Sequence, residues 1–425
     1  MKYFHMIISF VYFQVIGFIY LMFLRIQCVL EIMVWGSILL TDALILGGGA
    51  YFFLSADAWA IEDPQVYSDA DIRNAKIISY VLFALGGLFF LLMVYLRKEI
   101  QLAIGTVEET SKAINKMPLL SLYPVMECLG LVAFLGVWMV YAVYLASIGS
   151  LTTEVIGNPL NDATITMKVF EYDDIVVQSA WYLLFCLYWS YQFIISMGEI
   201  IVAMSVAKWY FTRDKSKIGN STVIKSISTS FFYHTGTAAF GSLILAIVRI
   251  IRTIIAKIQK EAKAADNKLA EILLCSCGCC LWCLDNFLRF MNKNAFIQTA
   301  IFGTSFCRSA TEAFYLIARN AAKIGAITYV SEAVSIVGKL FITASTGVAS
   351  YFAIDYFIGE DLSSIAGPCV LILILAYNVA DAFMDVFEIG VSTILQCFVA
   401  DDEMFTEEEA FAGGDLKEFI DEWEK

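Results

Sequence analysis

The sequence predicts an all-α fold, a polytopic bundle of about nine transmembrane helices at residues 1–399 with an acidic cytosolic tail at residues 400–425. Three observations predict it. The chain is 60% hydrophobic and only 16% charged. Apolar runs of roughly 20 residues, the length that crosses a bilayer core as a helix, recur along it. Short connectors between these runs alternate between basic and acidic. So many apolar runs cannot all be buried in one water-soluble core.

The first half of the chain contains five apolar runs. The first is too long for a secretory signal and lacks a small-residue cleavage site, so we interpret it as a retained span. The others follow after short connectors. The five predicted spans are Phe4–Leu24, Val29–Leu54, Ile77–Leu96, Leu119–Ile148 and Val177–Ala207.

The connectors predict which ends of these spans face the cytosol, because Lys and Arg in short loops mark that side. Three connectors are basic. The one after the first span holds Arg25, the one after the third span holds Arg97, Lys98, Lys112 and Lys116, and the one after the fifth span holds Lys208, Arg213, Lys215, Lys217 and Lys225. The loops Ser55–Lys76 and Ser150–Val176 are acidic. The alternation fits five successive crossings, the first of them entering from outside.

The second half of the chain is more polar. Phe231–Ile255 is apolar enough to span but has basic residues on both sides, and Met291–Ala322 carries several charged and amide residues. Either this pair crosses as a hairpin shielded by other helices, or it lies partly in the cytoplasmic interface. Val330–Phe357 and Pro368–Val399 are predicted as ordinary spans.

Charge and composition exclude several function classes. The net charge of −13 argues against a nucleic-acid partner, which would need a cationic face. Eleven of the acids lie between Asp401 and Glu424, which predicts a solvated terminus with a short helix around Leu416–Trp423. Only two histidines occur, so neither a histidine metal cage nor a histidine-activated nucleophile is expected. We therefore predict no enzymatic activity, no cofactor and no metal.

Five cysteines are clustered within nine residues: Cys275, Cys277, Cys279, Cys280 and Cys283. Their spacing would allow zinc binding, but no separated second pair and no histidine lies nearby. Clustered cysteines beside a membrane are natural palmitoylation sites. We interpret them as candidates for acylation or packing at a cytoplasmic interface, with inert thiols and a metal site as the alternatives.

Aromatic side chains and a carboxylate occur together in the fourth and fifth spans. Trp189 and Glu199 lie inside the fifth span, where a carboxylate is costly and therefore a functional candidate. Ring faces can replace the hydration of a quaternary ammonium, which has no N–H groups to donate. This pattern indicates an ammonium site, and ordinary helix packing is the alternative.

A polar stripe runs along the last span. Its members step by three or four residues and so share one helix face: Asn378, Asp381, Asp385 and Glu388. Such a stripe either lines a water-accessible path or forms a buried polar network. Lys339 in the preceding span is the cation expected to meet one of these acids.

Beyond about Tyr182 the sequence resembles the choline-transporter-like family of plasma-membrane solute carriers. The matching pieces keep their order and spacing: Trp209–Lys215, Tyr233–Gly236, Ala239–Ser242, Cys279–Leu284, Asn292–Ala295, Phe306–Ala310, Gly338–Lys339 and Leu395–Phe398. The resemblance covers roughly the last 240 residues. It implies a ten-helix bundle that moves choline and in some members ethanolamine. The first helix and the long extracellular loop of the family are not found here.

The resemblance leads us to expect transmembrane transport of choline or a related small ammonium compound. We expect Trp189, Tyr182 and Tyr141 to stack on the ammonium head, and Glu199 to balance its charge. Tyr233 and His234 would polarise or gate the path. A uniporter would need no coupling ion, whereas a proton-coupled exchanger would use the acids of the polar stripe.

Two other functions remain open on the sequence. One is a non-transporting membrane scaffold whose acidic tail recruits cytosolic partners, and the other is a lipid enzyme acting on choline head groups, for which no acid/base pair presents itself. We expect a small ammonium substrate and the lipid bilayer as partners, with protein partners unknown. The plasma membrane is the expected location and an internal membrane the alternative.

Overall fold

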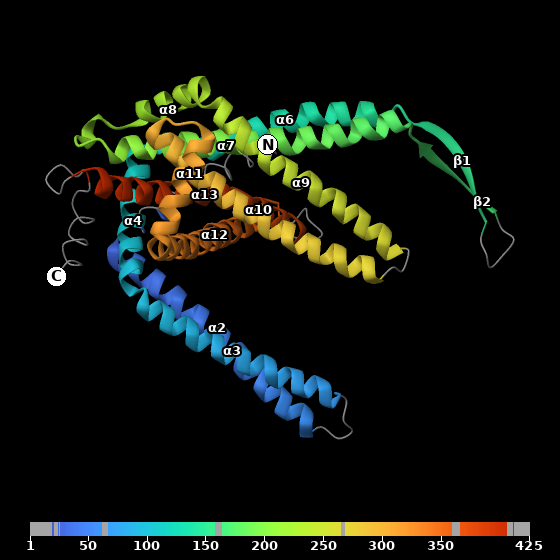
Figure 1. Cartoon of the computed structure of the whole chain (residues 1–425), viewed down its shortest axis with the longest axis horizontal. Helices are drawn as coiled ribbons and strands as arrows, with labels where there is room; N and C mark the ends of the chain where they lie inside the picture. Colours follow the sequence, from blue (N-terminus) through green and yellow to red (C-terminus); the bar gives the residue numbers. More distant parts are fainter. Residues whose placement is uncertain are drawn as a thin grey trace. The chain divides into compact units, whose positions relative to one another are not determined.

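The computed structural model describes residues 19–20, 24, 26–61, 67–157, 164–264, 268–358, 366–405 and 411 (Figure 1). The chain forms two compact units. The first is built from the described parts of 1–121, 206–222 and 316–425, and the second from those of 122–205 and 223–315. Each unit is almost wholly helical, as the sequence predicts.

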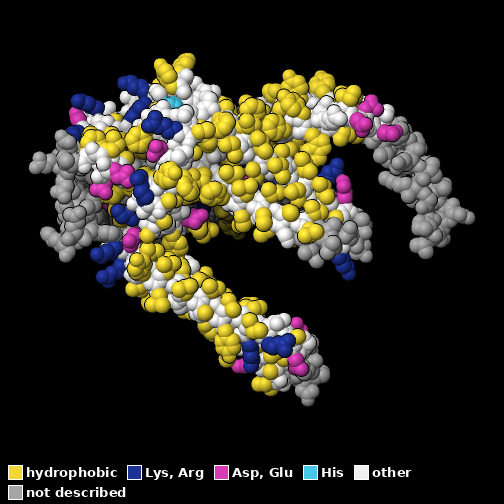
Figure 2. All heavy atoms as spheres, viewed as in Figure 1, with side chains coloured by type: hydrophobic (Ala, Val, Ile, Leu, Met, Phe, Trp, Pro, Cys, Tyr) yellow, Lys and Arg dark blue, Asp and Glu magenta, His cyan; other side chains and the backbone are white. Residues whose placement is uncertain are grey.

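The first unit contains two antiparallel helix pairs. Helix α2 (Gln27–Ile61) packs on α3 (Asp69–Tyr95), and α12 (Ala321–Ile358) packs on α13 (Ala366–Met404). Ser68 caps α3 in a reciprocal capping box with Asp71. Hydrophobic side chains cover the flanks of the α2–α3 pair, and charged ones gather where α2 finishes and α3 begins (Figure 2). A surface of this kind suits a lipid environment.

The basic connector predicted after Ile77–Leu96 is instead a helix, α4 (Arg97–Lys116), followed by the short α5 (Pro118–Ser121). Its apolar and small residues are buried against α12 and α13, and its lysines and arginine lie near its ends. The interpretation as a loop is therefore wrong. The charges at both ends concealed an amphipathic helix between them.

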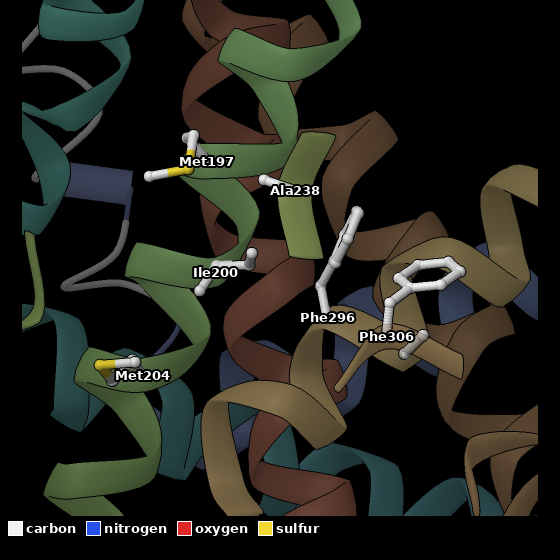
Figure 3. Close-up of a cluster of buried hydrophobic side chains, with 7 residues drawn as sticks. Met197, Ile200, Met204, Ala238, Phe296 and Phe306 are labelled. Carbon is white, nitrogen blue, oxygen red and sulfur yellow. The ribbon is translucent and has the colours of Figure 1, made fainter. Parts of the chain in front are cut away.

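The second unit contains α6 (Tyr123–Ala146), most of α7 (Asp174–Tyr210) and of α8 (Asn220–Tyr233), then α9 (Thr235–Ala264), α10 (Lys268–Phe302) and most of α11 (Phe306–Arg319). A one-turn 3-10 helix (Lys215–Lys217) precedes α8 in the chain. The core of the second unit joins four helices. Figure 3 shows its members, which are Met197, Ile200 and Met204 of α7, Ala238 of α9, Ala295 and Phe296 of α10, and Phe306 of α11.

The acidic loop predicted at Ser150–Val176 contains a β-hairpin. Strands β1 (Ser150–Gly157) and β2 (Thr164–Glu171) pair antiparallel, with Ser150 opposite Glu171 and Gly157 opposite Thr164. Both strands are rich in Thr, Val and Ile, the β-branched residues that favour extended backbone. That composition was the signal the sequence analysis missed.

Eight described helices are long and apolar enough to cross a membrane. Seven of them match predicted spans and the eighth overlaps only the start of the predicted segment Met291–Ala322, so the protein is a multi-pass membrane protein. The remaining predicted span, Phe4–Leu24, lies outside the described residues except for 19, 20 and 24. The predicted helix Leu416–Trp423 also lies outside them.

The predicted segment Met291–Ala322 is not one helix. Helix α10 ends at Phe302, Gly303 adopts a positive φ of 68°, and α11 begins at Phe306. A left-handed backbone of this kind favours glycine and commonly ends a helix. The apolar window that could span the membrane is Leu273–Phe302, which includes the cysteine cluster.

Candidate functional site

Trp189 lies half-buried on α7, in the second unit. Its indole N–H donates a hydrogen bond to the backbone carbonyl of Ala239 on α9, at 3.0 Å. Phe185, one turn earlier, lies beside it with ring centroids 6.0 Å apart. The hydrogen bond fixes the orientation of the indole, so its π-face is held in place.

The three tyrosines of the predicted site are largely exposed, both Tyr141 and Tyr182, predicted to stack with Trp189, and Tyr233, predicted to polarise or gate the path. Tyr141 is 64% exposed, Tyr182 69% and Tyr233 79%. Among the described residues, no ring contact joins any of them to Trp189. The structure therefore does not bring Tyr141 and Tyr182 together with Trp189 into one cage.

The two remaining candidates lie closer to the interior. Glu199 is half-buried on α7. His234 is buried at the break between α8 and α9, where its backbone N–H donates to Ser230 and its carbonyl accepts from the N–H of Ala238. His234 thus lies at the junction between the two helices, and its backbone hydrogen bonds link one helix to the other.

A second carboxylate within a span, Glu127 of α6, was missed by the sequence analysis. A Cβ atom added to Gly198 of α7 would lie 3.1 Å from a Glu127 carboxylate oxygen and 2.8 Å from a Tyr123 ring carbon. The Glu127 carboxylate therefore lies at the contact between α6 and α7, beside Gly198, the residue that precedes Glu199. Its position inside an apolar run, noted for Glu199 alone, was the available signal.

Two tryptophans that resemble interfacial anchors line one cavity. Trp138 donates its indole N–H to the carbonyl of Leu183, 2.9 Å away, which ties α6 to α7. Trp138, Trp181 and Tyr172 with aliphatic neighbours line a cavity of about 450 Å³ beside this contact. None of the described residues that line it is a carboxylate, so they offer no counter-charge for a cation.

The predicted ion pair of Lys339 is confirmed in the first unit. Its ammonium nitrogen lies 2.7 Å from Asp381 Oδ1 and 3.8 Å from Glu388 Oε1, joining α12 to α13. Asn378 instead donates its amide N–H to the carbonyl of Ile374 on its own helix. Part of the stripe thus forms a charged network between two spans.

The cysteine cluster is exposed along α10, and its thiols are free. Three contacts show that α9 runs antiparallel to α7: Lys257 over the Trp181 ring at 5.6 Å, Thr253 with Tyr188 at 3.0 Å, and Ala239 with Trp189. The start of α10 therefore lies at the end of α7 that follows the hairpin. By the predicted sidedness this is the outer side, not the cytoplasmic side expected for the cluster.

The acidic stretch after residue 400 is not solvated at its start. Asp401, on the last turns of α13, is 1% exposed. It accepts hydrogen bonds from the Tyr210 hydroxyl at 3.0 Å and from the backbone N–H of Phe411 at 2.9 Å. The expectation of a solvated terminus is therefore wrong at this residue, which holds residue 411 against the first unit.

Comparison with known proteins shows which family the chain resembles. The family profile of the plasma-membrane choline transporters matches residues 80–403. Choline transporter-like protein 2 of Dictyostelium discoideum is 31% identical over 374 residues, covering 86% of this chain and 58% of the relative. The Danio rerio protein of that name is 30% identical, with 91% and 62% covered. Choline transporter-like protein 1 of Rattus norvegicus is 28% identical, with 88% and 57% covered.

The chain spans about three fifths of the length of these relatives. The profile nevertheless covers most of both units, including α6, α7 and the α12–α13 pair. By this match the chain belongs to the plasma-membrane choline transporter family.

Proposed function

We propose that this protein carries choline, or a related small ammonium compound such as ethanolamine, across the plasma membrane without covalent chemistry. The single observation that supports this most strongly is the family match over residues 80–403. The scaffold alternative has no comparable support. A helical bundle with charged and aromatic groups inside its spans is the kind of structure such transport needs.

The second unit offers the groups that a trimethylammonium head requires. The N–H hydrogen bond of Trp189 fixes the orientation of its ring, and a cation would bind on the face of that ring. Glu127 and Glu199 supply carboxylates within the same unit. In the loaded state the exposed rings of Tyr141 and Tyr182 would have to approach the substrate, and Tyr233 with His234 would polarise or gate its path.

Radiolabelled choline uptake tests the proposal. The purified full chain is reconstituted into liposomes, with protein-free liposomes as the control. We expect saturable uptake that unlabelled choline abolishes and that ethanolamine inhibits more weakly, because a primary ammonium is better hydrated than a quaternary one. Uptake that is linear in choline concentration and equal to that of protein-free liposomes would contradict the proposal.

A further inference from the structure

A second, differently charged cavity lies between α7, α9 and α10 of the second unit. Its volume is about 460 Å³. Two arginines of α9 line it together with hydroxyl and amide side chains, and its lining residues include Arg249, Arg252, Tyr188, Thr253 and Gln259. No carboxylate is among the described residues that line it. The cavity therefore has a cationic wall.

The charge of that wall is only partly compensated. Asp285 of α10 is buried, and its Oδ2 atom accepts hydrogen bonds from Arg252 at 2.9 Å and from Arg289 at 3.1 Å. One carboxylate is thus shared by two guanidinium groups. Arg249, one turn before Arg252, makes no ion pair or hydrogen bond among the described residues. Three arginines against one aspartate leave an excess of two positive charges.

Such an excess is unfavourable within helices that cross a membrane, because charges removed from water need partners. Both α9 and α10 are candidate spans. A cationic substrate would be repelled from this wall, so the cavity differs in kind from a site for choline. An anion would supply the missing charge.

We propose that this cavity binds a phosphate group. Planar guanidinium forks match phosphate oxygens in a bidentate manner. The Thr253 hydroxyl already donates to the Arg249 carbonyl at 2.9 Å, so the Tyr188 hydroxyl, 3.0 Å from it, is the one that can turn to donate to the anion. The site is independent of the ammonium site proposed above, and its test does not require choline transport.

The position of the cavity favours the head group of a phospholipid as the source. Lys257 lies over the Trp181 ring, and a paired Trp and Lys mark the membrane–water boundary. Arg252 lies five residues before Lys257 on the same helix, which is about 7.5 Å along the axis. A phosphate near that boundary is therefore within reach of the guanidinium groups. Free inorganic phosphate has the same chemistry and is the alternative source.

Native mass spectrometry of the intact chain in neutral detergent tests the proposal. The probes are phosphatidylglycerol, phosphatidylcholine and inorganic phosphate. We expect the wild type to retain phosphatidylglycerol, and Arg249→Gln to weaken retention about tenfold or more, since a charge-assisted hydrogen-bonded contact is lost. Lys260→Gln is the matched control, because Lys260 is an exposed cation on the same helix that does not line the cavity. It should change retention less than twofold.

Two further measurements show whether the bound phosphate belongs to a lipid or is free, and provide a second variant in case the first does not fold. Displacement of the lipid by millimolar inorganic phosphate would indicate that free phosphate occupies the site, whereas resistance to it indicates the lipid head group. If Arg249→Gln does not fold, Asp285→Asn provides the opposite perturbation and should tighten retention by removing the competing carboxylate. Equal retention by wild type, Arg249→Gln and Asp285→Asn would overturn the proposal.

Discussion

At the scale of single residues, Gly390 shows how closely α13 approaches α4. A Cβ atom there would lie 2.7 Å from the Thr110 Cγ2 atom, closer than side-chain contacts allow. Gly390→Ala should therefore lower the free energy of unfolding by about 1–3 kcal/mol through overpacking. Gly325→Ala on α12, where nothing lies within 4 Å of an added Cβ atom, should be neutral or stabilising. Thermal unfolding in detergent compares the two, and equal shifts would contradict the close packing.

Asp401 is a second residue whose neighbours determine its role. Asp401→Ala leaves the Tyr210 hydroxyl and the Phe411 N–H without their acceptor, which should reduce stability by about 2 kcal/mol. Asp402→Ala removes an adjacent exposed carboxylate and should have almost no effect. Limited proteolysis between residues 405 and 411 measures the difference. Unchanged cleavage in Asp401→Ala would show that this aspartate does not hold Phe411.

The hydrogen bonds of Asp214 lead us to expect that local stability near this residue depends on pH. The hydroxyl of Ser216 and then its backbone N–H donate to this carboxylate, and they hold the pKa of Asp214 below its usual range. A depressed aspartate pKa stabilises the fold above the unfolded value, and that contribution is lost as pH falls through the folded value. Amide exchange at 215–218 should therefore quicken only in acid below the ordinary aspartate range. Asp214→Asn should abolish this dependence, and a dependence that persists would assign it to another group.

At the scale of elements, the Lys339 network links α12 and α13. Lys339→Met leaves Asp381 and Glu388 without their shared cation and should lower stability by about 1–2 kcal/mol. Asp381→Asn in the Lys339→Met background should lower stability less than it does alone, because the unpaired charge is then gone. Unfolding of the two single variants and the double variant measures the coupling, and strictly additive effects would show that the pair is not coupled.

Elements whose pattern is long and uniform were predictable. Apolar runs of about 20 residues identify spans by themselves, since only a helix satisfies its backbone in lipid. Helix α4 was missed because its basic ends resemble a loop, and the burial of its middle depends on α12 and α13, more than 200 residues later. The hairpin was missed because the acidic residues of Ser150–Val176 led to its interpretation as a loop. The break at Gly303 was hidden by polar residues on both sides.

At the scale of the whole molecule, sequence patterns predicted the class of protein better than its site. Residue type singled out Trp189 and Glu199, and it correctly paired Lys339 with an acid of the stripe. It could not show that Trp189 bonds to Ala239 or that Glu127 meets α7, because both depend on how helices distant in sequence pack. The exposed positions of Tyr141, Tyr182 and Tyr233 follow from packing in the same way.

Transport as proposed above depends on Trp189 holding an ammonium head by its ring face. Choline uptake by Trp189→Leu, compared with Tyr144→Leu on an exposed face of α6, tests this most directly. We expect KM for Trp189→Leu to rise about tenfold, because a desolvated cation–π contact contributes roughly 1–2 kcal/mol, while Tyr144→Leu keeps the wild-type KM. An unchanged KM in Trp189→Leu, with equal amounts of folded protein in the liposomes, would contradict it.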